Sequence, residues 1–230
     1  MPTPPLSGIS SMATRALLAE LAEAYRQHSG AGVRFESVGG VDAAKRVAAG
    51  EGFDVVVLAA DAIDKLESAG HVVAGSRADL VRSAVAVAVR AGAPHPDIGS
   101  EAALRRAVLA ARRIGYSTGP SGVALLALFE RWGLAETLRE RVLQAPPGVP
   151  VGTLVARGEV DLGFQQLSEL MHLPGIEVVG TMPEQAPIVS IFSGGLCSAG
   201  TQREAAAALL RFLRSPDTAA LKRKHGMEPA

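Results

Sequence analysis

The sequence has almost no cysteine, no net charge and no long uncharged apolar run. Its 230 residues include one cysteine, Cys197, which excludes an internal disulfide and a cysteine-based zinc site but leaves the redox compartment open. Basic and acidic residues both number 23, so the chain as a whole has no field that would recruit nucleic acid or an anionic membrane surface. Any charge selectivity must therefore be local, and we expect no nucleic-acid partner.

Signals for membrane spans, targeting and bound metals are also missing. No segment reaches the roughly 18 uncharged apolar residues of a membrane span. The first residues, MPTPPLSGISS, have neither the basic stretch nor the apolar core of a secretory signal. We therefore expect a periplasmic location if a signal peptide has been removed and a cytoplasmic one otherwise. The five histidines show no pair at metal-ligand spacing, so we expect no metal site and no cofactor.

What the sequence does contain is an alternation of strands and amphipathic helices. Apolar content is 48%, enough for one large domain or two lobes. The run FDVVVLAA at 53–60 is typical of a strand buried on both faces of a parallel sheet. Apolar residues at helical spacing predict a helix over 12–28, and further helices are predicted over 123–133 and 135–143. The pattern predicts an α/β fold.

Small polar residues follow four of the predicted strands. In open α/β sheets, ligands bind at the carboxyl ends of the strands, against helix N-termini. The same residue types are the preferred helix N-caps, so any one of these ends taken alone reads more readily as a cap. Their recurrence predicts one polar, anion-binding cleft. The four ends are Ser10 with Ser11, Gly39 with Gly40, residues 117–122, and Gln165 with Gln166.

The stretch IGYSTGPSG at 114–122 is the most distinctive of the four. It leads into a helix, and the first four amides of any helix lack intrahelical partners. Its glycine spacing is not that of the dinucleotide fingerprint, and no Lys-Ser or Lys-Thr follows as in a P-loop. Its hydroxyls and amides therefore predict half of an anion clamp that works without charge.

Three motifs, in order along the chain, resemble a known family. GEGFDVVVLA, GEVDLGF and FLRSPDTAALKRKHGM, with GYSTGPSG between the first two, are similar to type 2 periplasmic solute-binding proteins of the molybdate-binding-protein branch. The resemblance covers nearly the whole chain. It implies an α/β fold of two lobes, each a mostly parallel sheet flanked by helices, with a hinged ligand cleft between the lobes. Lobe one would be residues 1–82 plus 188–230, and lobe two residues 83–187.

The same resemblance implies a set of ligand contacts, which we carry over by position. The family's serine after the first strand matches Ser10 or Ser11, and its second serine pair matches Gly39 and Gly40. Its helix-start contacts match 117–122 and a position near Val151, and its tyrosine matches Gln166. The implied ligand-binding residues are Ser10, Ser11, Arg15, Gly39, Gly40, Ser117, Thr118, Ser121, Gly122, Val151, Gln165 and Gln166.

Departures from the family pattern favour a larger ligand than molybdate or tungstate. Glycines at 39 and 40 replace hydroxyls by bare amides and leave a wider floor. Arg15, one helical turn beyond Ser11, could hold a carboxylate through both guanidinium nitrogens, although it also fits a solvated helix position. We therefore prefer an organic polycarboxylate as ligand, and a solute-binding role for an ABC-type transporter. The resemblance implies a permease partner and a monomer.

An enzyme is the main alternative. GGVDAAKRV and GYSTGPSG, with the missing serines, are similar to the aconitate isomerases of this fold, which move a double bond within a tricarboxylate. That reaction needs a base beside an acidic C–H group and donors for the developing charge. The four strand ends contain no histidine, glutamate or lysine. Asp42 and Asp61 are near them, but both also fit as helix caps.

Overall fold

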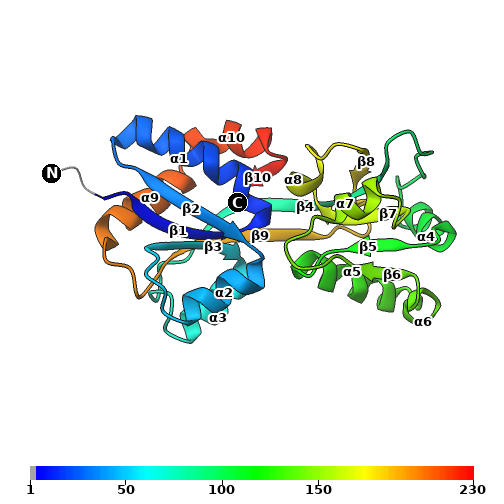
Figure 1. Cartoon of the computed structure of the whole chain (residues 1–230), viewed down its shortest axis with the longest axis horizontal. Helices are drawn as coiled ribbons and strands as arrows, with labels where there is room; N and C mark the ends of the chain where they lie inside the picture. The colour runs from blue at the N-terminus through cyan, green and yellow to red at the C-terminus, as the bar shows by residue number, and fades with distance from the viewer. Residues whose placement is uncertain (1–3) are drawn as a thin grey trace. The chain divides into compact units, whose positions relative to one another are not determined.

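The computed structural model describes residues 4–230, and the chain divides into two compact units (Figure 1). Unit 1 is Met1–Arg82 with Ile191–Ala230, and unit 2 is Ser83–Ser190. The chain enters unit 2 within strand β4 (Ala78–Arg90) and leaves it within strand β9 (Val189–Leu196). The lobe assignment from the sequence, with its second boundary at 187/188, stays a prediction.

The sheet of unit 1 has the order β2-β1-β3-β9. Strand β1 (Leu6–Ser11) pairs in parallel with β2 (Val33–Val38) and β3 (Val55–Ala59), and β9 runs antiparallel to β3. The short strand β10 (Met227–Pro229) pairs with β4. Because β1 and β2 are parallel, with Ser10 opposite Ser37, their carboxyl ends lie at one edge.

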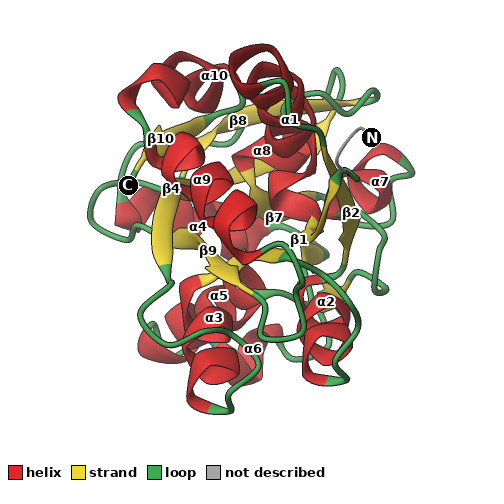
Figure 2. Cartoon of the chain, turned by 90° about the vertical axis from the view of Figure 1, so that its left-hand side faces the viewer, coloured by secondary structure: helices red, strands yellow, loops and turns green. Residues whose placement is uncertain are grey.

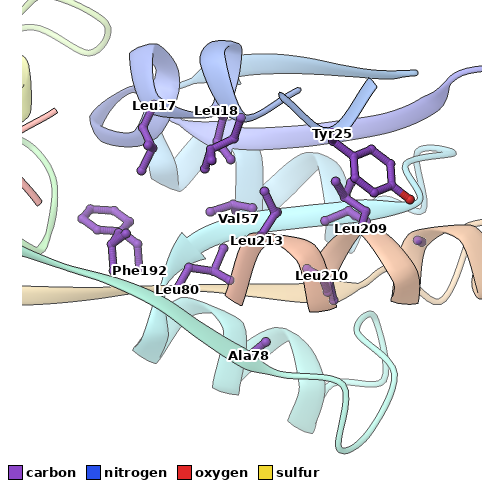
Figure 3. Packing of buried hydrophobic residues seen from close by; sticks show 14 of the residues in the cluster. Leu17, Leu18, Tyr25, Val57, Ala78, Leu80, Phe192, Leu209, Leu210 and Leu213 are labelled. Atoms are coloured by element: carbon purple, nitrogen blue, oxygen red, sulfur yellow. The ribbon is translucent and has the colours of Figure 1, made fainter. Parts of the chain in front are cut away.

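Two helical layers cover the sheet of unit 1, and the residues of β3 alternate between them. Val55 and Val57 share a core with α1 (Arg15–Ser29) and α9 (Arg203–Arg214). Figure 3 shows Val57 of this core together with Leu18 of α1 and Leu213 of α9. Val56 and Leu58 face α2 (Gly40–Ala48) and α3 (Ala60–Ser68). Figure 2 shows α1 and α10 (Ala219–Lys224) on one side of these strands and α2 and α3 on the other. The continuous apolar run is thus explained by burial on both faces.

Unit 2 has a sheet of the same kind, with the order β4-β7-β5-β6 and β8 on the other side of β4. Strand β5 (Ile114–Tyr116) is parallel to β6 (Val142–Gln144) and β7 (Leu162–Gln166). Strand β4 is antiparallel to β7 and to β8 (Ile176–Thr181). The carboxyl ends of β5, β6 and β7 therefore meet at one edge.

Helices also cover both faces of this second sheet. Val85 and Val87 pack with α4 (Glu101–Ala110), α5 (Pro120–Arg131) and α6 (Ala135–Leu138). The opposite face carries α7 (Val151–Ala156) and α8 (Leu167–Leu170). Helix α7 lies directly on β5, because a Cβ at Gly115 would be 2.9 Å from the Val151 side chain. Glycine there lets the helix approach the sheet.

The α/β alternation predicted from the sequence is confirmed, but the predicted helix over 135–143 is wrong. Helix α6 ends at Leu138, and residues 142–144 form β6. The Ile114 amide donates to the Arg141 carbonyl at 2.8 Å, and the Arg141 guanidinium donates to the Leu109 carbonyl at the end of α4 at 2.8 Å. The helical pattern of the sequence continues past Leu138, but these tertiary contacts favour a strand over residues 142–144. Over residues 4–230, no helix has the length and apolar character needed to cross a membrane.

A buried carboxylate joins three segments of unit 1. Asp54, 5% exposed, accepts hydrogen bonds from the amides of Ser7 at 2.9 Å, Thr201 at 3.0 Å and Gln202 at 3.1 Å. It thus links β1, the start of β3 and the segment before α9. Backbone amides of this kind are costly to bury without an acceptor.

We expect Asp54→Ala to lower the free energy of unfolding by about 3 kcal/mol or more, because three amides lose a charged acceptor. Chemical denaturation followed by circular dichroism measures the loss. Asp61→Ala is the matched control, since Asp61 is exposed and only approaches Lys65 at 3.7 Å. Equal stability of the two variants would contradict the assignment.

Candidate functional site

Unit 1 places an unpaired buried hydroxyl at the end of β1. Ser10 Oγ and Ser37 Oγ are hydrogen bonded to each other at 2.8 Å, so Ser10 is satisfied by the neighbouring strand. Ser11 Oγ is buried and has no hydrogen-bond partner among residues 4–230. A buried hydroxyl without a partner costs about 1–3 kcal/mol. Ser11 is therefore the member of the pair that is ready to bind a ligand oxygen.

The glycines after β2 lie beside this hydroxyl. Gly39 precedes α2, a helix of nine residues whose first turn has no side-chain cap. A Cβ built on Gly40 would be 3.6 Å from the Ser11 Cβ atom. The start of α2 thus offers uncapped amides next to the unpaired hydroxyl, and helix N-termini attract anions.

Charged side chains in this part of unit 1 are exposed. Arg15 is the first residue of α1 and makes no ion pair with any residue of the described chain. The positive end of the helix dipole disfavours a cation at this position, and an anion bound beside Arg15 would offset that repulsion. Asp42 and Asp61 are exposed in the first turns of α2 and α3. The expectation that they cap these helices is wrong, because the N-caps are Gly39 and Ala59 and no side chain caps either helix.

In unit 2, the loop after β5 carries a second pair of hydroxyls. Ser117 Oγ and Ser121 Oγ are 2.8 Å apart and hydrogen bonded, and Ser121 is buried. One hydroxyl proton is used within the pair, so the other remains available to a ligand acceptor. Thr118 is exposed in the same loop. Gly119 precedes α5, and this helix of twelve residues has no side-chain cap.

Glycine at position 122 is required by the backbone geometry of this loop. A Cβ at this position would collide with the Ser117 carbonyl oxygen. The loop folds back onto the first turn of α5, where the amides of Gly122 and Val123 donate to the Gly119 carbonyl at 3.0 and 3.3 Å. Glycine at 122 therefore allows the close approach that holds the two serines together.

The other predicted helix start in unit 2 is already engaged. The Val151 amide donates to Gln165 Oε1 at 2.7 Å, and Gln165 Nε2 donates to Glu169 Oε1 at 2.8 Å. Helix α7 is only six residues long. The predicted ligand contact at the Val151 amide is thus used within the protein, where it fixes the orientation of the Gln165 side chain.

Glu169, on α8, is the functional candidate that the sequence analysis missed. Its side chain is partly buried, and this burial raises the pKa of Glu169 to about 7, while the hydrogen bond from Gln165 lowers it. The residues predicted at the end of this strand extend only to Gln166, three positions before Glu169. The available signal was that Glu169 is the one acidic residue between Gln166 and Gly175.

Gln166 points to the opposite face of β7 from Gln165. Both glutamines are buried within the strand, although the sequence placed them after it. Gln166 Nε2 donates to Ser190 Oγ at 2.8 Å. With the amide reversed, it accepts from Ser190 and donates to the Ser83 carbonyl at 3.0 Å. Gln166 therefore ties β7 to the points at which the chain enters and leaves unit 2, and its proposed ligand contact stays a prediction.

Within residues 4–230, no group of three histidine, cysteine, aspartate or glutamate residues is placed to hold a metal ion. Cys197 is buried, and burial together with nearby Asp54 raises the pKa of its thiol to about 12. A thiolate nucleophile is thus disfavoured at this position.

The fold is the two-lobed α/β fold of type 2 periplasmic binding proteins, with helices flanking a mixed sheet. Residues 6–228 match the family described as bacterial extracellular solute-binding protein. The chain belongs to this family, as the resemblance of its motifs predicted.

The chain is similar to one protein by sequence and to two solved structures by fold. An aconitate isomerase from Pseudomonas sp. is 39% identical over 234 residues, covering 99% of this chain and 89% of that protein. The periplasmic molybdate-binding protein of Azotobacter vinelandii is 20% identical, with a TM-score of 0.79 over 96% of this chain and 98% of that one. The substrate-binding domain of a putative molybdenum ABC transporter from Clostridium difficile is 16% identical, with a TM-score of 0.77 over 98% and 99%. The two structures show the fold alone.

We expect Ser11→Ala to weaken anion binding by about five- to tenfold, because the ligand loses one hydrogen-bond donor. Stability should be unchanged, because the hydroxyl has no partner within residues 4–230. Calorimetric titration with citrate and aconitate measures affinity, and thermal unfolding measures stability. Ser10→Ala is the matched comparison, since it breaks the bond to Ser37. A Ser11 variant with unchanged affinity would show that this hydroxyl is not a ligand contact.

We expect Ser117→Ala combined with Ser121→Ala to lower anion affinity by about tenfold, because the loop loses the free proton of the hydroxyl pair. The fold should persist, because the two hydroxyls satisfy each other and leave together. Titration with the same anions gives the affinity and circular dichroism the fold. Affinity equal to that of the unmodified protein would rule out the clamp.

Proposed function

We propose that this protein binds an unsaturated polycarboxylate and interconverts cis- and trans-aconitate. The observation that carries the proposal is the 39% identity to an aconitate isomerase across 99% of the chain. This similarity reverses the preference from the sequence analysis, which favoured transport of an organic acid over isomerisation. We also propose that the protein lies outside the cytoplasm, because the family is described as extracellular.

The chemistry of the candidate residues supports a polycarboxylate. Hydroxyls at Ser11, Ser117 and Ser121 and the uncapped starts of α2 and α5 are neutral donors for carboxylate oxygens. Arg15 adds a cation that can hold one carboxylate bidentately. We propose that each unit contributes the ligand contacts predicted for it, namely Ser10, Ser11, Arg15, Gly39 and Gly40 in unit 1, and Ser117, Thr118, Ser121, Gly122, Gln165 and Gln166 in unit 2. The Val151 amide is not among them, because it donates to Gln165 Oε1.

Binding without turnover is the second candidate. Membership of a solute-binding family favours it, and in that case an ABC-type permease would be the partner and the organic acid the cargo. Molybdate and tungstate are less favoured as ligands, because Gly39 and Gly40 offer no hydroxyls where the family resemblance implies serines. Turnover in the absence of any partner separates the enzyme from the transport component.

We expect the purified chain to convert either aconitate isomer toward the same equilibrium mixture. Ultraviolet absorbance follows the reaction, and proton magnetic resonance identifies the isomers. The Ser117→Ala, Ser121→Ala double variant should be slower, because donors to the developing negative charge are removed. Stabilisation of the protein by aconitate without any change in absorbance would instead indicate a binding protein.

A further inference from the structure

We propose that Glu169 is the acid–base residue of this isomerisation and touches the substrate carbon that loses and gains the proton. The inference rests on the proposed function, which left the base unassigned. Asp42 and Asp61, the acids nearest the predicted strand ends, are exposed at helix starts. Glu169 differs from both in burial and in its hydrogen-bond partner.

The topology of unit 2 brings Glu169 to the edge that carries the donors. Tyr116 of β5 pairs with Phe164 of β7, so Ser117 and Gln165 are the next residues on adjacent parallel strands. Glu169 lies on α8, four residues after Gln165 of β7, and accepts a hydrogen bond from the Gln165 side-chain amide at 2.8 Å. The carboxyl group is therefore held at the same strand ends as the Ser117–Ser121 pair.

The Gln165 side chain is itself fixed, which restricts the Glu169 carboxyl. Gln165 Oε1 accepts from the Val151 amide, so Gln165 Nε2 is turned toward Glu169. This chain of two hydrogen bonds engages one carboxyl oxygen of Glu169. Within residues 4–230, Gln165 is the one side chain hydrogen bonded to this carboxyl, which leaves its second oxygen for a proton from the substrate.

The surroundings of Glu169 suit a group that gives and takes a proton near neutral pH. Helix α8 packs against β7, α7 and β8. Neither β7 nor α7 carries a titratable side chain, and Glu177 of β8 is hydrogen bonded to exposed His95 at 2.7 Å. One further titratable residue, His172, lies two positions after the end of α8. Burial raises the pKa of Glu169 to about 7, so both protonation states are accessible.

The reaction then balances without a cofactor. The Glu169 carboxylate takes a proton from the methylene carbon next to the double bond of aconitate. The electron pair left behind spreads over the three-carbon chain and the adjacent carboxylate, where neutral donors stabilise it. The Glu169 carboxylic acid returns the proton to the carbon that was the alkene CH. The double bond has moved, and the carboxylate is regenerated.

Glu169→Gln and Glu169→Asp together test the role. Glutamine keeps the size of the side chain and an oxygen that can accept from Gln165, but it cannot take a proton. Aspartate shortens the side chain but keeps the carboxylate. For a proton-transfer role we expect kcat to fall by about 100-fold or more in the glutamine variant, with residual activity in the aspartate variant. A purely structural role predicts the opposite order.

Three further measurements complete the experiment. Aconitate affinity by calorimetry should be kept in Glu169→Gln, while incorporation of solvent deuterium into aconitate should be lost with turnover. In the unmodified protein, kcat/KM should rise with pH through about 7, since the carboxylate is the reacting form. Glu140→Gln, at an exposed position of the same unit, is the control and should match the unmodified protein.

The outcomes distinguish this inference from the proposed function. An unmodified protein that binds aconitate without isomerising it overturns the function, and the inference falls with it. Isomerisation by Glu169→Gln at the unmodified rate overturns the inference and leaves the function standing. Loss of turnover and deuterium incorporation with binding retained supports both.

Discussion

Parallel strand pairing is the constraint on which the candidate site depends. In unit 1 it places the ends of β1 and β2 side by side, and in unit 2 it does the same for β5, β6 and β7. Residues far apart in the sequence, such as Ser117 and Gln165, thereby reach a common edge. Helices that begin at these ends turn their unpaired amides toward the same edge. Strand direction alone thus brings strand ends and helix N-termini together within each unit, whatever side chains they carry.

Neutral donors dominate the two edges, and this has a consequence for a polyanionic ligand. Hydroxyls and amides hold carboxylates through dipoles that are fixed by the fold, so little reorganisation is needed when charge moves within the ligand. A ring of lysines or arginines would bind the ground state more strongly without favouring the transition state. Arg15, exposed at the start of α1, is the one charged side chain among the predicted ligand contacts.

The sequence predicts the regular parts of this fold well and the tertiary exceptions poorly. The apolar run at 53–60 predicts a strand buried on both faces. The structure has such a strand, because helices cover both faces of the sheet there. The segment 142–144 could not be predicted as a strand, because its pairing with β5 is a contact across some thirty residues of chain. The sequence therefore predicts strands and helices correctly where the local hydrophobic periodicity agrees with the tertiary packing.

The candidate site shows the same division. Residue types at strand ends predicted Ser11 and the 117–122 loop as candidate contacts, but they could not show which hydroxyls already have partners. Gln165 and Gln166 looked equivalent in the sequence, yet neighbouring residues of a strand face opposite sides. Gln165 accordingly reaches Val151 and Glu169, whereas Gln166 reaches Ser190. Glu169 was missed because its importance lies in its burial, which a lone glutamate in a short segment after a strand does not reveal.

A carboxyl group with a pKa near 7 also bears on the choice between binding and catalysis. Beside a site for a polycarboxylate, an ionised glutamate repels the ligand, and binding raises the pKa of that glutamate further. A protein that only captures the ligand loses affinity through such a group, particularly above neutral pH. An isomerase needs it, because the ligand's own charge then keeps the proton available for return to carbon. The position of Glu169 at the donor edge of unit 2 is thus a cost for a transport component and a requirement for an enzyme.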